Sequence, residues 1–536
     1  MVLSSGQAAI FAGGEQISTA GTIIATKDSA TIAGTSTAFV THGVKEDDII
    51  YINFHPYHVK AVASATSLTI KETYRGGTTG ATNYAIYRPV RNILLENFTV
   101  ISDLRGNNGG ILFAWAEEVS INQVKVRSFS GQGITIRGVF NFRVENCETY
   151  GNTGTGIEVE EVATTDLLNN GIIKNCLSWS NDNRGINIEG NSMVRVLGCT
   201  ANGNNLGIRV ASAETHISGC NAEFNALDGI RLDDASYCQV VGNNASSNAA
   251  YGITLVLTST GSNNNTVQGN NCDLNPSGGI FVDGDSNSIV GNTIDQNNVE
   301  DSSGILLDTG SDNNTVTGNT IIDAEFGINV DSSLNSIGNN TISINNIGSD
   351  IGIWIQDDAD NNSITGNTVD GNGAGLIVFP VGINLDAGAT GNKISNNVLT
   401  GLITKLVDAG TGTIIASKFI PLNPPVEVLN TDPTSGSAWT DLDVTAQTTA
   451  DTYAVEGKMG LNSVTTVGRQ GFVRVNGSSE GQGNTTLAVR SQVVSQAAYC
   501  SFKVKVDSGQ IFEWSVNNAD VSALVIEIWG YWEYTY

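Results

Sequence analysis

Three glutamates in a repeated part of the sequence are the first candidates for catalysis. Glu158 and Glu160 lie two residues apart in one copy of the repeat, Glu189 lies in the next copy, and Asp233 lies two copies further on. Paired carboxyl groups hydrolyse glycosidic bonds, because one donates a proton while the other activates water or attacks the sugar. Crowding of like charges raises the pKa of one carboxyl, as a general acid requires. We therefore expect these four residues to be catalytic.

The spacing of the glutamates leaves two geometries open. Equivalent residues of stacked strands lie about 4.8 Å apart, and residues i and i+2 of one strand lie about 6.6 Å apart. Glu160 and Glu189 would then match the roughly 5 Å of a retaining glycosidase. The diagonal pair Glu158 and Glu189 would match the roughly 6.5–9.5 Å of an inverting one. A solvated ladder of Glu–Arg ion pairs, or sugar binding without catalysis, is the alternative.

Candidate substrate-binding residues combine cations for polar groups with tryptophans that stack on sugar rings. They form three groups: Arg137, Arg209 and Arg231 around the glutamates; Trp354, Gln356 and Asp357 further along; and Trp179, with Asp182 and Arg184, on another face.

A short phrase, Gly-Ile-x-aliphatic, recurs through this region and must position these side chains. Its copies follow each other at steps of 22 to 30 residues and begin at Gly110, Gly133, Gly156, Gly185, Gly207, Gly229, Gly252, Gly279, Gly304, Gly327, Gly352 and Gly382. A second phrase lies between successive copies and consists of an aliphatic residue, any residue, Gly or Asn, then Cys or Asn. Val144–Cys147 and Val316–Asn319 are examples.

The repeat predicts the fold. A fixed period in the twenties indicates one unit stacked many times, and the short alternating segments with Gly, Asn, Asp and Ser turns favour strands. We therefore predict an all-β chain built on a right-handed parallel β-helix of about 12 coils. Side chains alternate along a strand, so the x residue and the residue after the aliphatic point outward in two columns. The long step from Gly156 to Gly185 adds residues 162–170, which could wall a groove.

The cysteines favour a structural role. Cys147, Cys176, Cys199 and Cys220 occupy one position of four successive copies, and asparagine takes over this position from Asn243 onward. This exchange predicts a ladder of small inward-facing side chains at a bend. No Cys-x-x-Cys spacing occurs, and we expect neither a metal nor a cofactor.

Charge and hydropathy exclude several classes of function. The formal net charge of −27 argues against a nucleic-acid partner. No apolar run approaches the length of a membrane span, so we expect no membrane insertion. The N-terminus lacks a basic start and an apolar stretch, so no secretory signal is expected.

The chain divides by composition into five parts. We expect a lead at 1–18, a small β-barrel-like module at 19–89, the β-helix at 90–408, a proline-containing linker at 409–425, and a jelly-roll-like β-sandwich at 426–536. The aromatic C-terminal end could be a carbohydrate platform or a subunit interface.

The N-terminal module contains motifs that resemble a small β module common in bacteriophage virion and tail proteins. These motifs are Gly34–Phe39, Val44–Ile50, Thr66–Ile70 and Tyr84–Tyr87. With the β-helix and the terminal sandwich, the order of modules resembles phage tailspikes over nearly the whole chain. The coil repeat alone also resembles that of pectate lyases and uronan epimerases.

The tailspike resemblance implies a homotrimer in the virion tail that acts outside the cell. It implies binding, and usually cleavage, of a bacterial surface polysaccharide such as capsule, exopolysaccharide or O-antigen, and attachment to other tail proteins through residues 19–89. A polysaccharide lyase or uronan C5-epimerase is a further alternative. It is less favoured, because His216 is isolated and no acidic metal cage is evident in the sequence.

Overall fold

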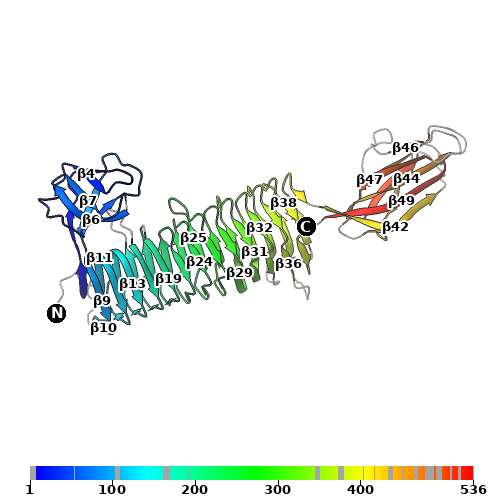
Figure 1. Ribbon diagram of the computed structural model, residues 1–536. Coiled ribbons are helices and arrows are strands. Elements are labelled where there is room, and N and C mark those ends of the chain that lie inside the picture. The colour runs from blue at the N-terminus through cyan, green and yellow to red at the C-terminus, as the bar shows by residue number, and fades with distance from the viewer. Residues whose placement is uncertain are drawn as a thin grey trace. The chain divides into compact units, whose positions relative to one another are not determined.

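Stacked parallel strands form the body of the protein in the computed structural model (Figure 1). The structure describes residues 8–53, 55–102, 109–160, 169–190, 192–344, 350–371, 380–402, 404–415, 417–431, 439–448, 452–463, 469–476, 488–490, 498–507, 510–516 and 521–534. All secondary structure in these residues is β, and the stack makes about 13 turns. The predicted parallel β-helix is confirmed. The proposed groove wall at 162–170 falls largely outside the described residues.

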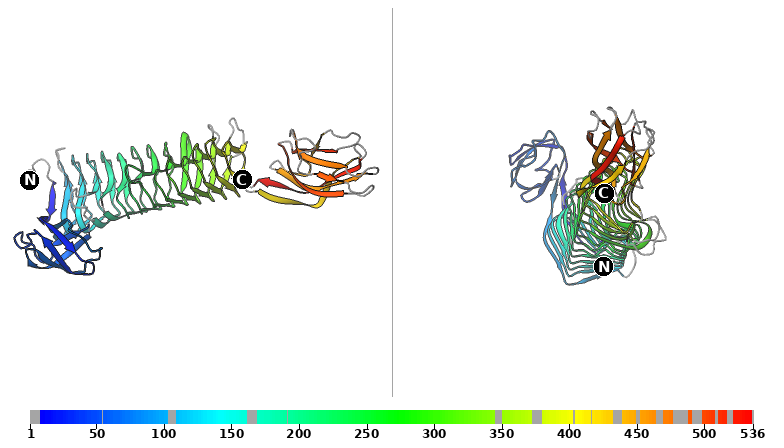
Figure 2. Two further views of the ribbon diagram at one scale, coloured as in Figure 1. Left: turned by 90° about the horizontal axis from the view of Figure 1, so that it is seen from above. Right: turned by 90° about the vertical axis from the view of Figure 1, so that its right-hand side faces the viewer.

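Each coil contributes strands to three faces of the β-helix, and equivalent strands stack along its axis (Figure 2). The first face contains the Gly-Ile-x-aliphatic phrase and consists of β11 (Ile111–Asn122), β13 (Ile134–Glu145), β15 (Ile157–Glu160), β18 (Arg184–Glu189), β21 (Leu206–Ala211), β23 (Ile230–Asp233), β25 (Tyr251–Val256), β27 (Gly278–Val282), β29 (Thr293–Leu307), β31 (Thr320–Val330), β34 (Ile351–Ile355), β37 (Val381–Leu385) and β40 (Thr404–Asp408).

The second face contains the second phrase and also includes the later halves of β11 and β13. Its other strands are β9 (Val90–Glu96), β16 (Asn169–Lys174), β19 (Ser192–Leu197), β22 (His216–Ser218), β24 (Gln239–Val241), β26 (Thr266–Gln268), β28 (Ser288–Val290), β30 (Thr315–Thr317), β32 (Ser336–Gly338), β35 (Ser363–Thr365), β38 (Lys393–Ser395) and β41 (Ile414–Ile415).

The third face is built from shorter strands and single bridges at Asn221, Asn244 and Asn271. It includes the first residues of β29 and β31. Its other strands are β10 (Thr99–Ile101), β12 (Lys125–Arg127), β14 (Glu148–Tyr150), β17 (Leu177–Trp179), β20 (Thr200–Asn202), β33 (Thr341–Ser343), β36 (Thr368–Asp370) and β39 (Val398–Thr400).

The second phrase specifies the bend that leaves the second face. Its Gly or Asn has a positive φ in coil after coil, as in Gly242 (64°), Gly318 (66°) and Asn339 (54°). Glycine and asparagine are the residues that enter this conformation most easily. The bend turns the next residue, Cys or Asn, into the interior, where it is buried. Gly or Asn therefore recurs at this position because the backbone of each coil needs a residue that accepts a positive φ.

The buried residue of this bend joins each coil to the next. Asn319 donates from Nδ2 to the carbonyl of Ile289 in the preceding coil (2.9 Å) and to Oδ1 of Asn340 in the following coil (2.9 Å). Its own Oδ1 accepts the backbone N–H of Asn292 (2.9 Å). The same pattern links Asn243, Asn270, Asn292, Asn319, Asn340 and Asn367. We call this the asparagine ladder.

The four aligned cysteines continue the ladder toward the N-terminus. They are free and buried, and their thiols lie against carbonyl oxygens of the preceding coil, as from Cys176 Sγ to the Val144 oxygen (3.3 Å). The predicted inward-facing ladder at a bend is confirmed. A thiol satisfies the carbonyl but makes a weaker hydrogen bond than an amide.

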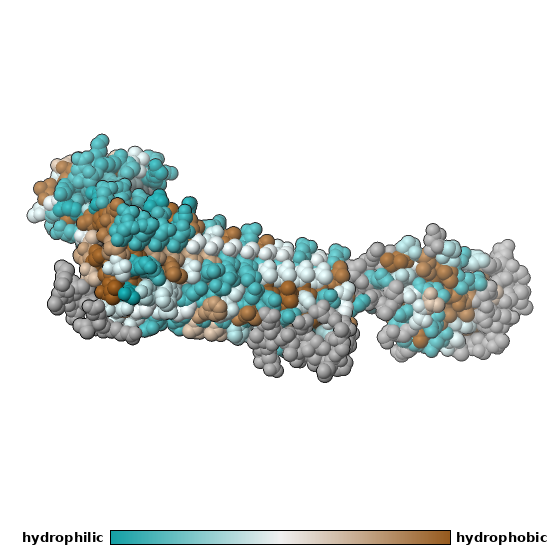
Figure 3. Space-filling view, turned by 90° about the horizontal axis from the view of Figure 1, so that it is seen from below, coloured by the Kyte–Doolittle hydropathy of each residue, from teal (hydrophilic) through white to brown (hydrophobic). Residues whose placement is uncertain are grey.

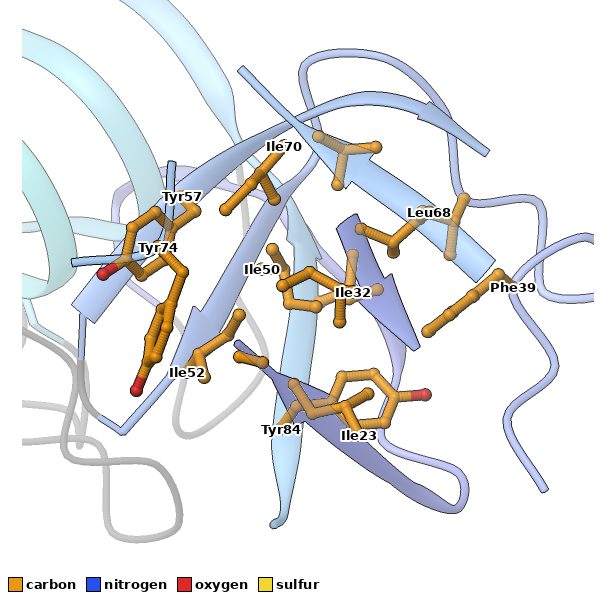
Figure 4. Packing of buried hydrophobic residues seen from close by; sticks show 14 residues of the cluster. Ile23, Ile32, Phe39, Ile50, Ile52, Tyr57, Leu68, Ile70, Tyr74 and Tyr84 are labelled. Atoms are coloured by element: carbon orange, nitrogen blue, oxygen red, sulfur yellow. The ribbon is translucent and has the colours of Figure 1, made fainter. Parts of the chain in front are cut away.

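The N-terminal module is an antiparallel sheet with strand order β2-β8-β5-β6-β7-β4-β3. A bridge between Ile23 and Thr82 brings β3 toward the start of β8, which gives a barrel-like form. Its core is a cluster of Ile, Leu, Phe and Tyr side chains (Figure 4). The strands are β2 (Glu15–Ser18), β3 (Thr22–Ala25), β4 (Thr31–Thr35), β5 (Ile49–Ile52), β6 (His55–Ser64), β7 (Ser67–Ile70) and β8 (Tyr84–Arg88).

The C-terminal unit is a sandwich of two four-stranded antiparallel sheets around a shared apolar core. One sheet has the order β42-β49-β44-β47 and the other β43-β48-β45-β46. The strands are β42 (Ser417–Thr431), β43 (Thr440–Asp443), β44 (Thr452–Ser463), β45 (Gln470–Val475), β46 (Ala488–Arg490), β47 (Ala498–Lys505), β48 (Ile511–Val516) and β49 (Val521–Tyr534).

Two expected boundaries differ from the structure. Within the lead at 1–18, β1 (Ile10–Gly13) pairs in parallel with β11 and so belongs to the β-helix. The linker at 409–425 is not free, because it contains β41 and the first part of β42. Proline is tolerated in β42 because this strand lies at a sheet edge, and its register shifts between Pro421 and Val426 around the remaining prolines.

Removal of one amide from the asparagine ladder should destabilise the protein. Asn319→Ala leaves the Ile289 carbonyl and the Asn292 N–H buried without their partner, which costs about 1–3 kcal/mol per group. We expect a lower midpoint of urea unfolding, measured by circular dichroism. Thr315→Ala, on the exposed side of the neighbouring β30, is the control and should change the midpoint little. Equal midpoints for the two variants would contradict the role given to the ladder.

Candidate functional site

The register of the first face places the predicted outward columns as expected. Glu158 pairs with Thr135 and Asn187, and Arg209 pairs with Asn187 and Arg231. The second column aligns in the same way, with Arg137 beside Glu160. Residues more than twenty positions apart in sequence are therefore vertical neighbours on one surface, and the candidate catalytic residues share this face.

Glu158 is buried, with only 6% of its surface exposed, and among the described residues it forms no ion pair, unlike the equally buried Asp228 and Asp233. It accepts hydrogen bonds from the Asn187 amide and from Thr155, both of them neutral donors. The pKa of Glu158 is raised to about 7, chiefly by burial and to a smaller extent by the negative charge of Glu189, while the hydrogen bonds from Thr155 and Asn187 and the charge of Arg184 oppose the shift. Near neutral pH this side chain exchanges between acid and carboxylate, as a general acid must.

Glu189 lies diagonally from Glu158 and has cationic partners. Arg209 Nη1 donates to Glu189 Oε1 at 2.6 Å, and Arg184 Nη1 is 4.0 Å from the same oxygen. A third of the Glu189 side chain is exposed to solvent. One step across the stack and two residues along the strand separate the two backbones by about 8 Å. The face thus presents one protonatable and one ion-paired carboxyl at a diagonal spacing.

Glu160 is held by a different arginine. Arg137 donates to Glu160 Oε2 from Nε (3.0 Å) and from Nη2 (2.6 Å). Glu160 and Glu189 are therefore not two free carboxylates that face each other, since each has its own guanidinium. The diagonal arrangement of Glu158 and Glu189 is the better supported of the two geometries.

Arginines and aspartates extend the charge network toward the C-terminus. Asp233 accepts from Nε of Arg209 through one oxygen and from Nε of Arg231 through the other, the latter at 2.5 Å. Arg231 also contacts buried Asp228 at 3.4 Å, and Thr254 donates to the same carboxylate at 3.1 Å. Burial raises the pKa of Asp228. The guanidinium groups of Arg209 and Arg231 thus hold the carboxylates in place.

Two members of this network were missed or misplaced by sequence reasoning. Asp228 was not selected, and Arg184 was assigned to the Trp179 patch although it lies beside Glu158 and Glu189. Both residues immediately precede the glycine of the repeated phrase, as does Thr155. The residues before this glycine form a third column, and the polar residues in it would have identified Arg184 and Asp228.

The two other predicted patches lie away from this network. Eight coils further along the first face, Trp354 Nε1 donates to Asp386 (2.9 Å), Gln356 donates to Asn329 (2.7 Å), and Asp357 accepts the N–H of Gly388 (2.9 Å). Trp179 lies on the third face, where it stacks on Tyr150 with ring centres 4.6 Å apart. Neither patch is brought together with Glu158.

Metal binding and membrane insertion are two further possibilities for the described residues. Among the described residues, no group of three or more His, Cys, Asp or Glu side chains is arranged to hold a metal ion. The described part of the chain also has no helix that could span a bilayer.

The raised pKa of Glu158 predicts an unusual pH dependence of stability. Between about pH 4.5 and 7 the unfolded chain has released the Glu158 proton while the folded chain retains it, so the stability contributed by this group falls as pH rises through that window. In Glu158→Gln this fall should disappear. Unfolding midpoints across pH 4–8 would measure it, with Glu223→Gln on the third face as the control. A fall of unchanged size in Glu158→Gln would contradict the protonation of this carboxyl.

Comparison with known proteins supports the fold. A family model described as a right-handed β-helix region matches residues 109–272, and a second, described as the periplasmic copper-binding protein NosD, matches residues 256–414. Copper is bound by Cys, Met and His side chains. Residues 256–414 contain no His or Met and one Cys, the fully buried Cys272, so the chain does not fit a copper site there. No curated protein matches the chain.

Solved structures with similar strand arrangements come from several enzymes and phage proteins. The tailspike gp49 of Pseudomonas phage LKA1 aligns at 12% identity, over 99% of this chain and 84% of that one, with a TM-score of 0.43. An alginate lyase from Paenibacillus sp. str. FPU-7 aligns at 14% identity, over 59% and 99%, with a TM-score of 0.35. A tailspike double mutant of E. coli bacteriophage HK620 in complex with pentasaccharide aligns at 11% identity, over 82% and 85%, with a TM-score of 0.37.

The periodic sequence, the stacked strands and the matching family model agree with one another. The chain is a right-handed parallel β-helix protein.

Proposed function

We propose that this protein binds and hydrolyses a polysaccharide on the first face of its β-helix, with Glu158 as general acid and Glu189 as general base. The observation that carries the proposal is the buried carboxyl of Glu158, whose pKa is raised to about 7, diagonal to the ion-paired carboxylate of Glu189. This combination of one protonated and one ionised carboxyl is what glycoside hydrolysis uses.

The reaction follows from these two protonation states. Glu158 donates its proton to the glycosidic oxygen as the bond from that oxygen to the anomeric carbon breaks. Glu189 removes a proton from a water molecule whose oxygen forms a new bond to the anomeric carbon on the opposite side of the ring. A diagonal spacing leaves room for this water, and the product has inverted configuration. Solvent then returns a proton to Glu158 and removes one from Glu189.

The arginine network positions the base in this scheme. Arg209 contacts Glu189 directly, and Asp233 holds Arg209 and Arg231 in register. We therefore assign Asp233 a positioning role, although its type and place also suit catalysis. The Arg137–Glu160 pair borders the site and would contact the polymer. Trp354, Gln356 and Asp357 would contact a distant part of a long chain on the same face.

The substrate class and location rest on the resemblance of the sequence to phage tailspikes. On that basis the polymer is a bacterial surface polysaccharide such as capsule, exopolysaccharide or O-antigen, and the protein acts outside the cell as part of a virion tail. Residues 19–89 would attach it to other tail proteins. The proposal includes a homotrimer.

A receptor-binding spike without catalysis is the second candidate. It is favoured by one observation: Glu160, Glu189 and Asp233 are all ion-paired with arginine, as in a structural charge ladder. In that case the first face would bind polysaccharide and leave its bonds intact.

Loss of either carboxyl function should abolish hydrolysis. Glu158→Gln and Glu189→Gln should each lower the release of reducing ends from purified capsule or lipopolysaccharide by about 10²–10⁴-fold. Activity of the unchanged protein should fall as pH rises above about 7, because Glu158 loses its proton. A reducing-end assay across pH 5–9 measures both effects.

Glu223→Gln, on the third face, is the control and should retain activity. Binding of polysaccharide with no new reducing ends would favour the non-catalytic spike. Products that absorb in the ultraviolet would indicate a lyase and overturn the hydrolytic mechanism.

The proposed homotrimer has a direct test. Light scattering should give three times the 56.2 kDa mass of one chain. A mass equal to one chain would contradict the trimer without bearing on the chemistry of Glu158.

A further inference from the structure

A hollow lies on the second face, away from the glutamates. It has a volume of about 940 Å³ and crosses β16, β19, β22 and β24. A second hollow of about 500 Å³ crosses β11, β13 and β16, and it adjoins the first, since Asn170, Gly171 and Ile172 line both. Together they form one groove that runs along the axis over six successive strands.

The floor of this groove is a column of outward side chains. Arg143 pairs in register with Ile172, Ile172 with Arg195, and Arg195 with His216. Arg195 is exposed and has no ion pair among the described residues. Arg143 is also exposed, and its ion pair with Glu145 is long, at 3.8 Å. Two accessible guanidinium groups in a chain of net charge −27 provide a local site for negative charge.

The rim of the groove carries strained residues. At the bend before the second face, several coils place Asn or Ser in the left-handed conformation, as in Asn264, Ser286 and Asn313, and two place glycine, Gly391 and Gly412. Four further described coils place larger residues there with positive φ: Glu118 (58°), Glu214 (58°), Tyr237 (60°) and Leu334 (61°). Glu118, Glu214 and Tyr237 line the groove.

Large side chains in this conformation carry a backbone cost that glycine avoids and asparagine partly avoids. Their concentration at the groove therefore points to a function for these side chains rather than for the bend. Tyr237 is 63% exposed and Met193, which lines the same hollow, is 42% exposed, so both offer apolar surface to a ligand. A tyrosine ring suits the apolar face of a sugar, and carboxylates accept hydrogen bonds from hydroxyl groups.

We propose that this groove is a second binding site for an extended oligosaccharide in which acidic sugars alternate with neutral ones. Arg143 and Arg195 are two strands apart, or about 10 Å, and would pair with carboxylates on alternate sugars. Ile172 between them would face a neutral sugar. Glu118 and Glu214 on the rim disfavour a chain with a carboxylate on every unit. Binding here does not depend on catalysis by Glu158.

The test uses hyaluronan hexasaccharide, in which glucuronic acid alternates with N-acetylglucosamine, and chitohexaose as the neutral chain of equal length. Isothermal titration should show that the first binds and the second binds at least about tenfold more weakly. Arg195→Ala should weaken hyaluronan binding at least about tenfold, and Lys393→Ala, an exposed cation on the second face outside the groove, should not.

Tyr237→Asn provides a variant that should fold at least as well, because asparagine suits the bend, and yet binds more weakly. Glu158→Gln should bind hyaluronan hexasaccharide as the unchanged protein does, which separates this site from the proposed hydrolytic one. Equal binding of the two hexasaccharides, no effect of Arg195→Ala, or no binding of either hexasaccharide would overturn the inference.

Discussion

The structure depends on a buried polar side chain at one corner of successive coils, which is a thiol from Cys147 to Cys220 and an amide from Asn243 to Asn367. At the asparagine ladder the backbone turns a corner, so the strand pairing that satisfies carbonyls elsewhere is interrupted. The side-chain amide of each asparagine supplies the missing donor to the preceding coil and accepts an N–H in return. Because a buried polar group without a partner is costly, a shift of one coil against the next is penalised at this corner as well as along the strands. Hydrogen bonds of buried side chains thereby stabilise the correct register of the stacked coils.

The surface chemistry follows from that register. Outward positions of successive coils become columns, and on the first face the columns collect carboxylates and guanidinium groups that neutralise one another. Glu158 is the exception, since its hydrogen-bond donors are neutral and its side chain is buried. On the side of the shaft that Figure 3 shows, the coloured surface is mostly hydrophilic or intermediate, with hydrophobic residues in smaller patches. A buried carboxyl whose pKa is raised to about 7 within a network of paired charges is a candidate for function.

Much of the fold could be predicted from the sequence because each coil of the β-helix corresponds to one copy of a sequence repeat. The Gly-Ile-x-aliphatic phrase gave the outward column from Leu112 to Asn384 correctly, and the exchange of Cys220 for Asn243 gave the inward ladder. Periodicity describes strands well but bends poorly. Arg184 begins β18 directly after a bend, and Asp228 lies in the turn before β23, so their approach to Glu158 and Arg231 was not evident. The ion pairs could not be predicted either, because the alignment of residues in a column does not determine which carboxylate each arginine contacts. The strand that contains Pro421 was misjudged because its partner, β49, is distant in sequence.

The central claim is that Glu158 and Glu189 act as a diagonal acid and base with a water molecule between base and sugar. Proton NMR of the anomeric signals during the first minutes of polysaccharide hydrolysis tests this most directly. The account predicts that the newly formed reducing end appears first with the configuration opposite to that of the cleaved bond. A product that first appears with the configuration of the cleaved bond would require a covalent intermediate and would contradict the diagonal geometry.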